Sequence, residues 1–354
     1  MKLPSINIVF STQATTSITR SDKGIVALIL RDANAEGGYV LTSNSQIPAT
    51  LGVENKAFIE RAFIGYINPP RKVIVYVLPN DSESLEDALA YLETQTFDYL
   101  AGPVDISSEE CLEVSNWIKA QRADGFKKKA VLPNIGADNE GIINFTTSGI
   151  KVGATEYDSA EYCSRIAGLI AGTPMTISST YAILPEVSDV DRLTKSQMDD
   201  AIDSGEFIIF YDGEKVKVGR GVNSLQTLTQ DKGEIFKKIK IVDTVDMIRK
   251  DIKETVEDNY IGKYSNNYDN KCVLISAIKG YFSGLEDSGI LEKDTSVVDI
   301  DIDSQELYLQ GKGIDTSAMA EQDIKSAVTG DKVFLKAQIK VLDAIEDISL
   351  NITI

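Results

Sequence analysis

The sequence predicts a mixed protein with an inserted α/β domain, a β-hairpin, a C-terminal α+β module and a strand-like arm at each end. Strand and helix patterns alternate through the middle of the chain, which is typical of a parallel or mixed sheet. Helix patterns followed by strand patterns in the last third indicate an α+β module. Apolar residues alternate with polar ones near both termini, which predicts extended segments there. The 354 residues suffice for two domains.

Residues 1–24 are predicted to form an N-terminal arm. Ile6, Ile8 and Phe10 alternate with polar or smaller side chains, and Pro4 and the Ser/Thr-rich sequel disfavour a helix. The apolar run is interrupted by a polar residue and no small-residue cleavage site follows it, so we expect no secretory signal and a protein that is intracellular when made.

Residues 25–230 are predicted to form an α/β domain. Apolar runs suited to buried strands lie at Lys72–Leu78, Phe97–Gly102 and Lys129–Ile135. Helical spacing of apolar residues, with Ser or acidic residues at the start, predicts helices over residues 82–95, 107–123 and 158–172. The pattern strand, helix, strand, helix, strand favours a sheet with helices packed on it.

A β-hairpin is predicted over Glu206–Gly221, where the sequence reads EFIIFYDGEKVKVGRG. Two strand-like runs flank Asp212 and Gly213, a dipeptide that readily adopts the positive φ of a type I′ turn.

Residues 231–342 are predicted to form the α+β module. Its first strand is expected at Phe236–Ile241, and a helix follows because Val245, Ile248, Ile252 and Val256 recur at steps of three and four. A second helix is expected at Asn270–Gly289, and strand patterns return at the stretch SVVDIDID and in the tail.

The tail contains two strand patterns. In the first, the apolar residues are Val333, Leu335, Ala337, Ile339 and Val341. In the second, they are Ile348, Leu350, Ile352 and Ile354. The connector Asp343–Asp347 has no Gly, Pro or Asn-Gly to form a tight hairpin. Fully extended, the tail would span about 70 Å, far more than the ~13 Å radius of gyration of a hundred-residue module. It must either fold back or pair with another chain.

Composition excludes several functions. The net charge of −18 argues against nucleic acid as a partner, because phosphate binding needs clustered Lys and Arg. The chain has no histidine, which excludes Ser-His-Asp and Cys-His centres and imidazole zinc sites.

The three cysteines, Cys111, Cys163 and Cys272, are far apart and are expected to be small buried hydrophobes. No run approaches the ~20 apolar residues of a membrane helix. We expect no metal and no cofactor.

Three acidic or glycine-rich features have ordinary structural interpretations. Asp299, Asp301 and Asp303 would share one strand face, where a charged edge strand is favoured over a divalent-cation site. No Walker A motif and no GxGxxG occurs. The carboxylate pairs adjacent in sequence, Glu109–Glu110, Asp199–Asp200 and Glu346–Asp347, are interpreted as solvated faces.

Two longer stretches and the terminal strands resemble the contractile tail sheath proteins of bacteriophages, R-type bacteriocins and defective prophages. The stretches are RIAGLIAGTPMTISSTYAILPEV (Arg165–Val187) and KKIKIVDTVDMIRKDIKETVEDNYIGKYSNN (Lys237–Asn267). The resemblance covers about two thirds of the chain, and the second stretch is its most specific part.

The resemblance implies that residues 231–342 form an inner sheath wall and that the α/β domain lies outside it. It implies that residues 343–354 form a C-terminal arm. The linking strands would be Ile6–Phe10 and Ile348–Ile354, which add to a sheet in neighbouring subunits. The acceptor would be the strand near Asp331–Leu342. The implied protein is not an enzyme. The resemblance further implies a helical homo-oligomer of stacked hexameric rings around a tail tube, with baseplate and tail terminator proteins as further partners and polar connectors that let subunits rotate.

Two other classes remain open at this level. An α/β enzyme acting on a phosphorylated or nucleotide-sugar substrate would need a pocket at the carboxyl ends of Val73–Leu78 and Ala130–Leu132, and activity lost on changing Asp299 or Asp301 would favour it. A donor-strand pilus subunit would also have spare strands, but it normally requires export.

Overall fold

The computed structural model describes residues 18–20 and 23–353. Its contacts divide the chain into two compact units. Asp22–Asp246 together with Asp343–Ile354 form what we call the α/β unit, and Met247–Leu342 form the helical unit. Residues 231–246 therefore group with the α/β unit, and so does the C-terminal segment that follows the helical unit.

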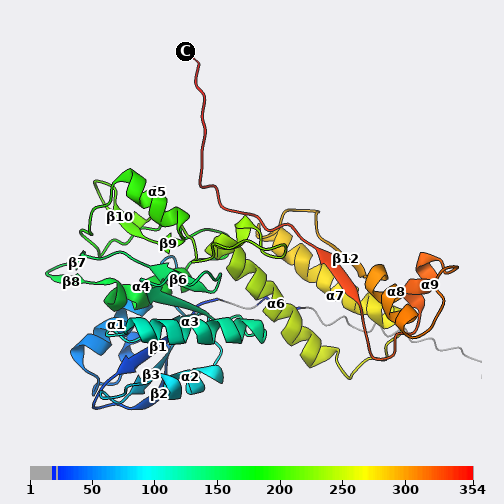
Figure 1. The fold of residues 1–354 in the computed structure, drawn as a ribbon, viewed down its shortest axis with the longest axis horizontal. Helices are drawn as coiled ribbons and strands as arrows, with labels where there is room; N and C mark the ends of the chain where they lie inside the picture. Colours follow the sequence, from blue (N-terminus) through cyan, green and yellow to red (C-terminus); the bar gives the residue numbers. More distant parts are fainter. Residues whose placement is uncertain (1–17, 21–22, 354) are drawn as a thin grey trace, which may run out of the picture. The chain divides into compact units, whose positions relative to one another are not determined.

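The α/β unit is built on a sheet with the strand order β2-β3-β1-β4-β5-β6-β9 (Figure 1). Its strands are β1 (Ile25–Arg31), β2 (Gly37–Leu41), β3 (Lys72–Leu78), β4 (Tyr99–Ala101), β5 (Lys129–Pro133), β6 (Ile142–Phe145) and β9 (Glu206–Phe207). Strand β2 is antiparallel to β3, and every other neighbouring pair is parallel. The mixed α/β and α+β fold class predicted from the sequence is confirmed.

Helices cover both faces of this sheet. One face packs against α1 (Val53–Ile64) and α4 (Ser159–Ala171), and the other packs against α2 (Glu86–Glu93) and α3 (Ser108–Ala123). The side chains of β1 contribute to both faces. Val26, Leu28 and Leu30 pack in the core on the α1 and α4 side, whereas Ala27 and Ile29 pack in the core on the α2 and α3 side. Because side chains alternate across a strand, a run that is apolar throughout must be buried on both sides.

The strand β1 is absent from the strands predicted above, although its sequence IVALILR is apolar except for its last residue. It pairs with β3 and β4, so it lies inside the sheet. The predicted strands near Lys72, Phe97 and Lys129 are present as β3, β4 and β5. The sheet therefore starts earlier in the chain than the alternating pattern indicates.

Helix starts agree with the sequence in two of three cases. Ser107 caps α3 and Asp158 caps α4, each in a reciprocal capping box with a Glu three residues later. The predicted start of α2 is wrong: the helix begins at Glu86, and Leu85 at its N-cap makes no side-chain cap bond. Of the preceding serines, Ser82 donates its backbone N–H to Pro79 O, and Ser84 Oγ accepts a hydrogen bond from Glu86 N.

The predicted hairpin is present as β10 (Ile209–Tyr211) and β11 (Val216–Val218), but its turn differs. Asp212 N donates to Lys215 O, so the central pair is Gly213 and Glu214. Only Gly213 of this pair has positive φ, at 109°, which excludes a type I′ turn. The Asp212 carboxylate instead accepts from the backbone N–H groups of Glu214 and Lys215.

The remaining elements of the α/β unit are short and lie outside the main sheet. They are η1 (Asn44–Gln46), α5 (Lys195–Asp203), η2 (Glu234–Lys237) and the hairpin of β7 (Ile150–Val152) and β8 (Thr155–Tyr157).

The strand predicted at Phe236–Ile241 is wrong. These residues form η2 and the start of α6 (Ile239–Asn259), a helix whose first turns belong to the α/β unit and whose later turns belong to the helical unit. Ile241 precedes Val245 by four residues, so the helical spacing extends one turn further back than predicted.

The helical unit contains α7 (Tyr268–Asp287), β12 (Val297–Ile300), α8 (Ile302–Gly311), α9 (Glu321–Ser326) and β13 (Leu335–Gln338). The buried Lys271 ammonium of α7 donates to Gln305 Oε1 at 3.1 Å and to Thr329 Oγ1 at 3.3 Å. The Tyr281 hydroxyl donates to an Asp251 carboxylate oxygen at 2.6 Å. These buried polar contacts tie α6, α7 and α8 together within the unit.

The placement of Asp299, Asp301 and Asp303 on one strand face is wrong. Strand β12 ends at Ile300, and Asp301 is the N-cap of α8, where it accepts from Ser304 N. Asp299 pairs with Lys325 at 2.7 Å, and Asp303 lies in the first turn of α8. An aspartate before a helix satisfies unpaired backbone N–H groups, which the alternating sequence pattern conceals.

Candidate subunit-linking site

The end of the chain is extended and exposed (Figure 1). Of the predicted linking residues, Ile348, Leu350 and Ile352 are 82%, 75% and 76% exposed. Within the described residues this segment belongs to no strand or helix. Three large apolar side chains at alternating positions are thus left in water, where each forgoes about 1.5–3 kcal/mol of burial free energy.

The other predicted linking residues, Ile6, Ile8, Phe10 and Ile354, lie outside the described residues. The structure places the C-terminal arm as far as Thr353, and the prediction for the N-terminal arm remains a prediction.

The predicted acceptor region forms a small sheet in the helical unit. Strands β12 and β13 pair antiparallel, with Val298 opposite Ala337 and Ile300 opposite Leu335. The backbone pairing continues past β13, because Glu292 N donates to Lys340 O and Leu342 N donates to Ile290 O. Among the described residues no third strand joins either outer edge of this sheet.

The regular strand is shorter than the alternating pattern predicted. Strand β13 covers Leu335–Gln338, so Leu335 and Ala337 are the only predicted apolar residues in it. Val333, Ile339 and Val341 lie outside it. On the shared face of the sheet, Val298 and Ile300 of β12 are buried, but Ala337 is exposed and Leu335 is half-buried. The apolar face is therefore covered on the β12 side and open towards the free edge of β13.

The connector before the C-terminal arm is docked on the α/β unit. Glu346 accepts hydrogen bonds from Thr180 Oγ1 at 2.6 Å, from Ser178 Oγ at 3.1 Å and from Arg220 Nε at 3.0 Å. Lys238 Nζ lies 3.3 Å from the same carboxylate and also pairs with Asp343. Burial by itself raises the pKa of Glu346, but these donors and charges outweigh it and hold the pKa below its usual value.

This docking was missed in the sequence. The sequence predicts a solvated pair at Glu346 and Asp347, which is wrong for Glu346: its side chain is only 7% exposed, whereas the Asp347 side chain is 86% exposed. The partner residues of Glu346 lie more than a hundred positions away, so no local pattern could reveal them. The connector Asp343–Asp347 is therefore bound to the α/β unit through Glu346 and is not a flexible link.

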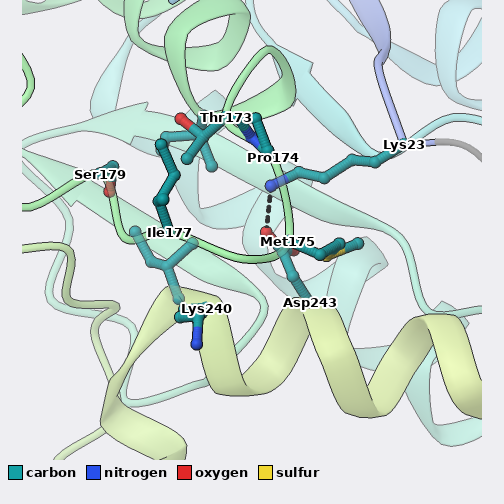
Figure 2. A pocket seen from close by; sticks show the side chains of 10 residues that line it. Lys23, Thr173, Pro174, Met175, Ile177, Ser179, Lys240 and Asp243 are labelled. Atoms are coloured by element: carbon teal, nitrogen blue, oxygen red, sulfur yellow. Dashed lines mark hydrogen bonds and ion pairs between the residues drawn. The ribbon is translucent and has the colours of Figure 1, made fainter. Parts of the chain in front are cut away.

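A second ionic cluster lies at the amino-terminal edge of the main sheet. Lys23, just before β1, pairs with Asp243 of α6 (Figure 2), and Lys129 at the start of β5 lies 3.2 Å from the same carboxylate. The Tyr99 hydroxyl donates to Asp243 at 2.6 Å. Burial alone would raise the pKa of Asp243, but Lys23, Lys129 and Tyr99 lower it below its usual value. The cluster fixes the first turns of α6 against the sheet.

The cavity beside this cluster is too small for a substrate. Lys23, Thr173, Met175 and Asp243 are among its lining residues (Figure 2), and its volume of about 10 Å³ is close to that of one water site. It lies where β1 begins, whereas ligands of α/β sheets bind at the carboxyl ends of the strands. Among the described residues no group of three or more Cys, Asp or Glu side chains is arranged to hold a metal ion. The alternative of an α/β enzyme would need a pocket at the carboxyl ends of the strands, and this cavity is not such a pocket.

No helix in the described part of the chain is both long and apolar enough to span a membrane.

The enzyme hypothesis that involved Asp299 and Asp301 is not supported by their contacts. The Asp299 carboxylate is paired with Lys325, and the Asp301 carboxylate caps α8.

Comparisons with known proteins assign its family. Residues 80–224 match the family described as the phage tail sheath protein central domain, and residues 231–354 match the phage tail sheath C-terminal domain. The chain is 42% identical over 356 residues to the tail sheath protein of Clostridium phage phiCD119, covering 99% of both. It is 27% identical over 274 residues to the phage-like element PBSX protein XkdK of Bacillus subtilis, covering 76% of this chain and 55% of that protein.

Solved structures show the same fold. The contracted helical sheath of the anti-feeding prophage matches with a TM-score of 0.73 at 15% identity, covering 100% of this chain and 99% of that chain. The sheath tail protein of Desulfitobacterium hafniense matches with a TM-score of 0.71 at 18% identity, covering 84% and 94%. The chain belongs to the phage tail sheath family, and the resemblance noted in the sequence is confirmed. It is a structural component of a phage-type tail and not an enzyme.

Proposed function

We propose that this chain is the subunit of a contractile tail sheath that polymerises as stacked hexameric rings around a tail tube. A baseplate trigger would release the extended polymer into a shorter, wider one irreversibly and drive the tube through a cell envelope. Residues 231–342 would form the inner wall and residues 25–230 the outer domain, with residues 231–246, which group with the α/β unit by their contacts, at the junction in sequence. The tube, baseplate and tail terminator proteins are the other partners, and assembly takes place in the bacterial cytoplasm.

Two observations support the proposal: residues 348–353 are exposed with alternating apolar side chains on the α/β unit, and among the described residues the β12–β13 sheet of the helical unit has only two strands. The segment Ile348–Thr353 of one copy fits the free edge of β13 in another copy. Its even-numbered apolar side chains then continue the face formed by Leu335 and Ala337. A contact between two different surfaces that does not close on itself generates a helical filament, as a sheath requires.

The energetics of such a link suit a polymer that must assemble and then move. Each added backbone hydrogen bond contributes about 0.5–1.5 kcal/mol net. Burial of Ile348, Leu350 and Ile352 adds about 1.5–3 kcal/mol per side chain. A single link is therefore strong but reversible, because association and ordering of the arm oppose these gains, and many links together make the polymer tenacious. We propose that Ile6, Ile8 and Phe10 make the corresponding N-terminal link.

Deletion of residues 348–354 tests the proposal. The truncated chain should remain folded, because the described residues it loses are exposed, yet it should form no tubes. The test compares full-length and truncated protein by negative-stain microscopy and sedimentation, with and without a tail tube. The proposal fails if the truncated chain forms normal tubes.

A further inference from the structure

The C-terminal arm leaves the molecule from an anchored root. The root, Asp343–Asp347, is covalently attached to the helical unit but belongs to the α/β unit by its contacts. The residues that hold it come from three segments: the loop with Ser178 and Thr180, the end of the β10–β11 region at Arg220, and Lys238 just before α6.

The anchoring is electrostatic. Ile345 is 88% exposed, so apolar packing contributes little at the centre of the root. The Glu346 carboxylate, in contrast, is almost fully buried and is contacted by two hydroxyl groups, a guanidinium and an ammonium. Charge-assisted hydrogen bonds to a buried group are short and directional, so they define one position and one orientation of the chain.

The pairs on either side of Glu346 are more exposed. Asp343 pairs with Lys238, and Asp347 pairs with Arg220, while the Asp347 side chain itself is 86% exposed. Exposed ion pairs contribute little and are screened by salt. The buried carboxylate is therefore the group whose loss should release the root.

We propose that Glu346 is a positioning residue that fixes the point and direction in which the C-terminal linking strand leaves the α/β unit. This inference rests on the proposed linking function of the strand. Each link would then join the α/β unit of one copy to the β12–β13 sheet in the helical unit of another. Movement of either unit would be transmitted to the neighbour through the Glu346 anchor.

Releasing the root changes the reach of the arm. Anchored at Glu346, the free segment is residues 348–354, and without the anchor it is residues 343–354. Effective concentration falls roughly as the −3/2 power of the length of a flexible chain. Lengthening the free segment from seven to twelve residues lowers it about twofold. Loss of the fixed direction lowers it further.

The test measures the root directly on the unassembled chain. Spin labels are attached to Ile345→Cys, within the root and 88% exposed, and to Lys195→Cys on α5, whose side chain is 86% exposed in the same unit. Cys272→Ser removes the partly exposed native thiol, while Cys111 and Cys163 are buried. The pulsed-EPR distance distribution should be narrow in the parent chain and at least about twofold broader in Glu346→Gln.

Matched variants make the outcome decisive. Asp347→Asn removes the adjacent exposed charge and should leave the distribution narrow. Arg220→Gln keeps Glu346 but removes its guanidinium donor, and it should broaden the distribution as Glu346→Gln does. Circular dichroism confirms that each variant is folded. An unchanged width in both Glu346→Gln and Arg220→Gln overturns the proposal, and so does equal broadening by Asp347→Asn.

The same variants separate this inference from the proposed function. Glu346→Gln should raise the critical concentration for tube formation at least about twofold without abolishing tubes, whereas deletion of residues 348–354 should abolish them. If the deleted chain still polymerises, the linking function is wrong whatever the labels report. If only the label result fails, the link stands and Glu346 does not position it.

Discussion

Replacing Leu350 by serine should weaken polymerisation and leave the subunit itself unchanged. Full burial of a leucine side chain contributes about 2 kcal/mol. Three quarters of the Leu350 side chain is exposed in the isolated chain. Covering that part on a neighbouring subunit would contribute about 1.5 kcal/mol per link, which corresponds to about a tenfold change in affinity.

The assay is the concentration dependence of tube formation. Parent and variant chains are sedimented over a range of concentrations, and the pellets are inspected by negative-stain microscopy. We expect the critical concentration of Leu350→Ser to rise about tenfold, with the melting temperature of the unassembled chain unchanged. Asn351→Ser is the matched control, since the neighbouring side chain points to the opposite face of a strand. Its critical concentration should stay within about twofold of the parent value.

Two results would refute this reasoning. Equal effects of Leu350→Ser and Asn351→Ser would show that the segment does not bind as a strand with one buried face. A lowered melting temperature in Leu350→Ser would show that this side chain packs within its own subunit.

Two further substitutions test the packing of each unit. Gly168→Ala would place a methyl group 2.0 Å from the carbonyl oxygen of Ala62, so we expect α1 and α4 to separate and the free energy of unfolding to fall by about 1–3 kcal/mol, measured in urea. The control Gly280→Ala has open space on α7 and should be neutral or stabilising, and equal losses in both would contradict the close helix contact. Asp301→Ala removes the cap of α8 and should cost about 1 kcal/mol, whereas Asp303→Ala, at a 90% exposed side chain, should not. A larger loss for Asp303→Ala in thermal unfolding would reverse this assignment.

Much of the fold was readable because the relevant interactions are local. The central strand β3 is a continuous apolar run, and the starts of α3 and α4 carry Ser107 and Asp158 three residues before a Glu. Short-range periodicity and capping determine such elements. The predicted elements are wrong where one sequence pattern is compatible with two kinds of structure. Apolar residues around Ile241 fit a strand or a helix, and the alternating Asp residues that end in Asp301 fit a strand face or a helix cap.

The linking strand stays a prediction. Alternation in the tail predicts that Leu350 and its neighbours form a strand on another subunit, and in this chain they are exposed and belong to no strand.

The sequence by itself determined the fold class, the absence of histidine chemistry and the alternation of apolar residues near the C-terminus, because these follow from composition and from neighbours within a few residues. Only the tertiary structure decided that Glu346 is buried against Thr180, Arg220 and Lys238, and that β13 pairs with β12 alone among the residues that the structure describes. Both depend on segments far apart in the chain. Whether a carboxylate is solvated or anchored is decided by the donors that the fold brings to it, and spacing along the chain does not record them.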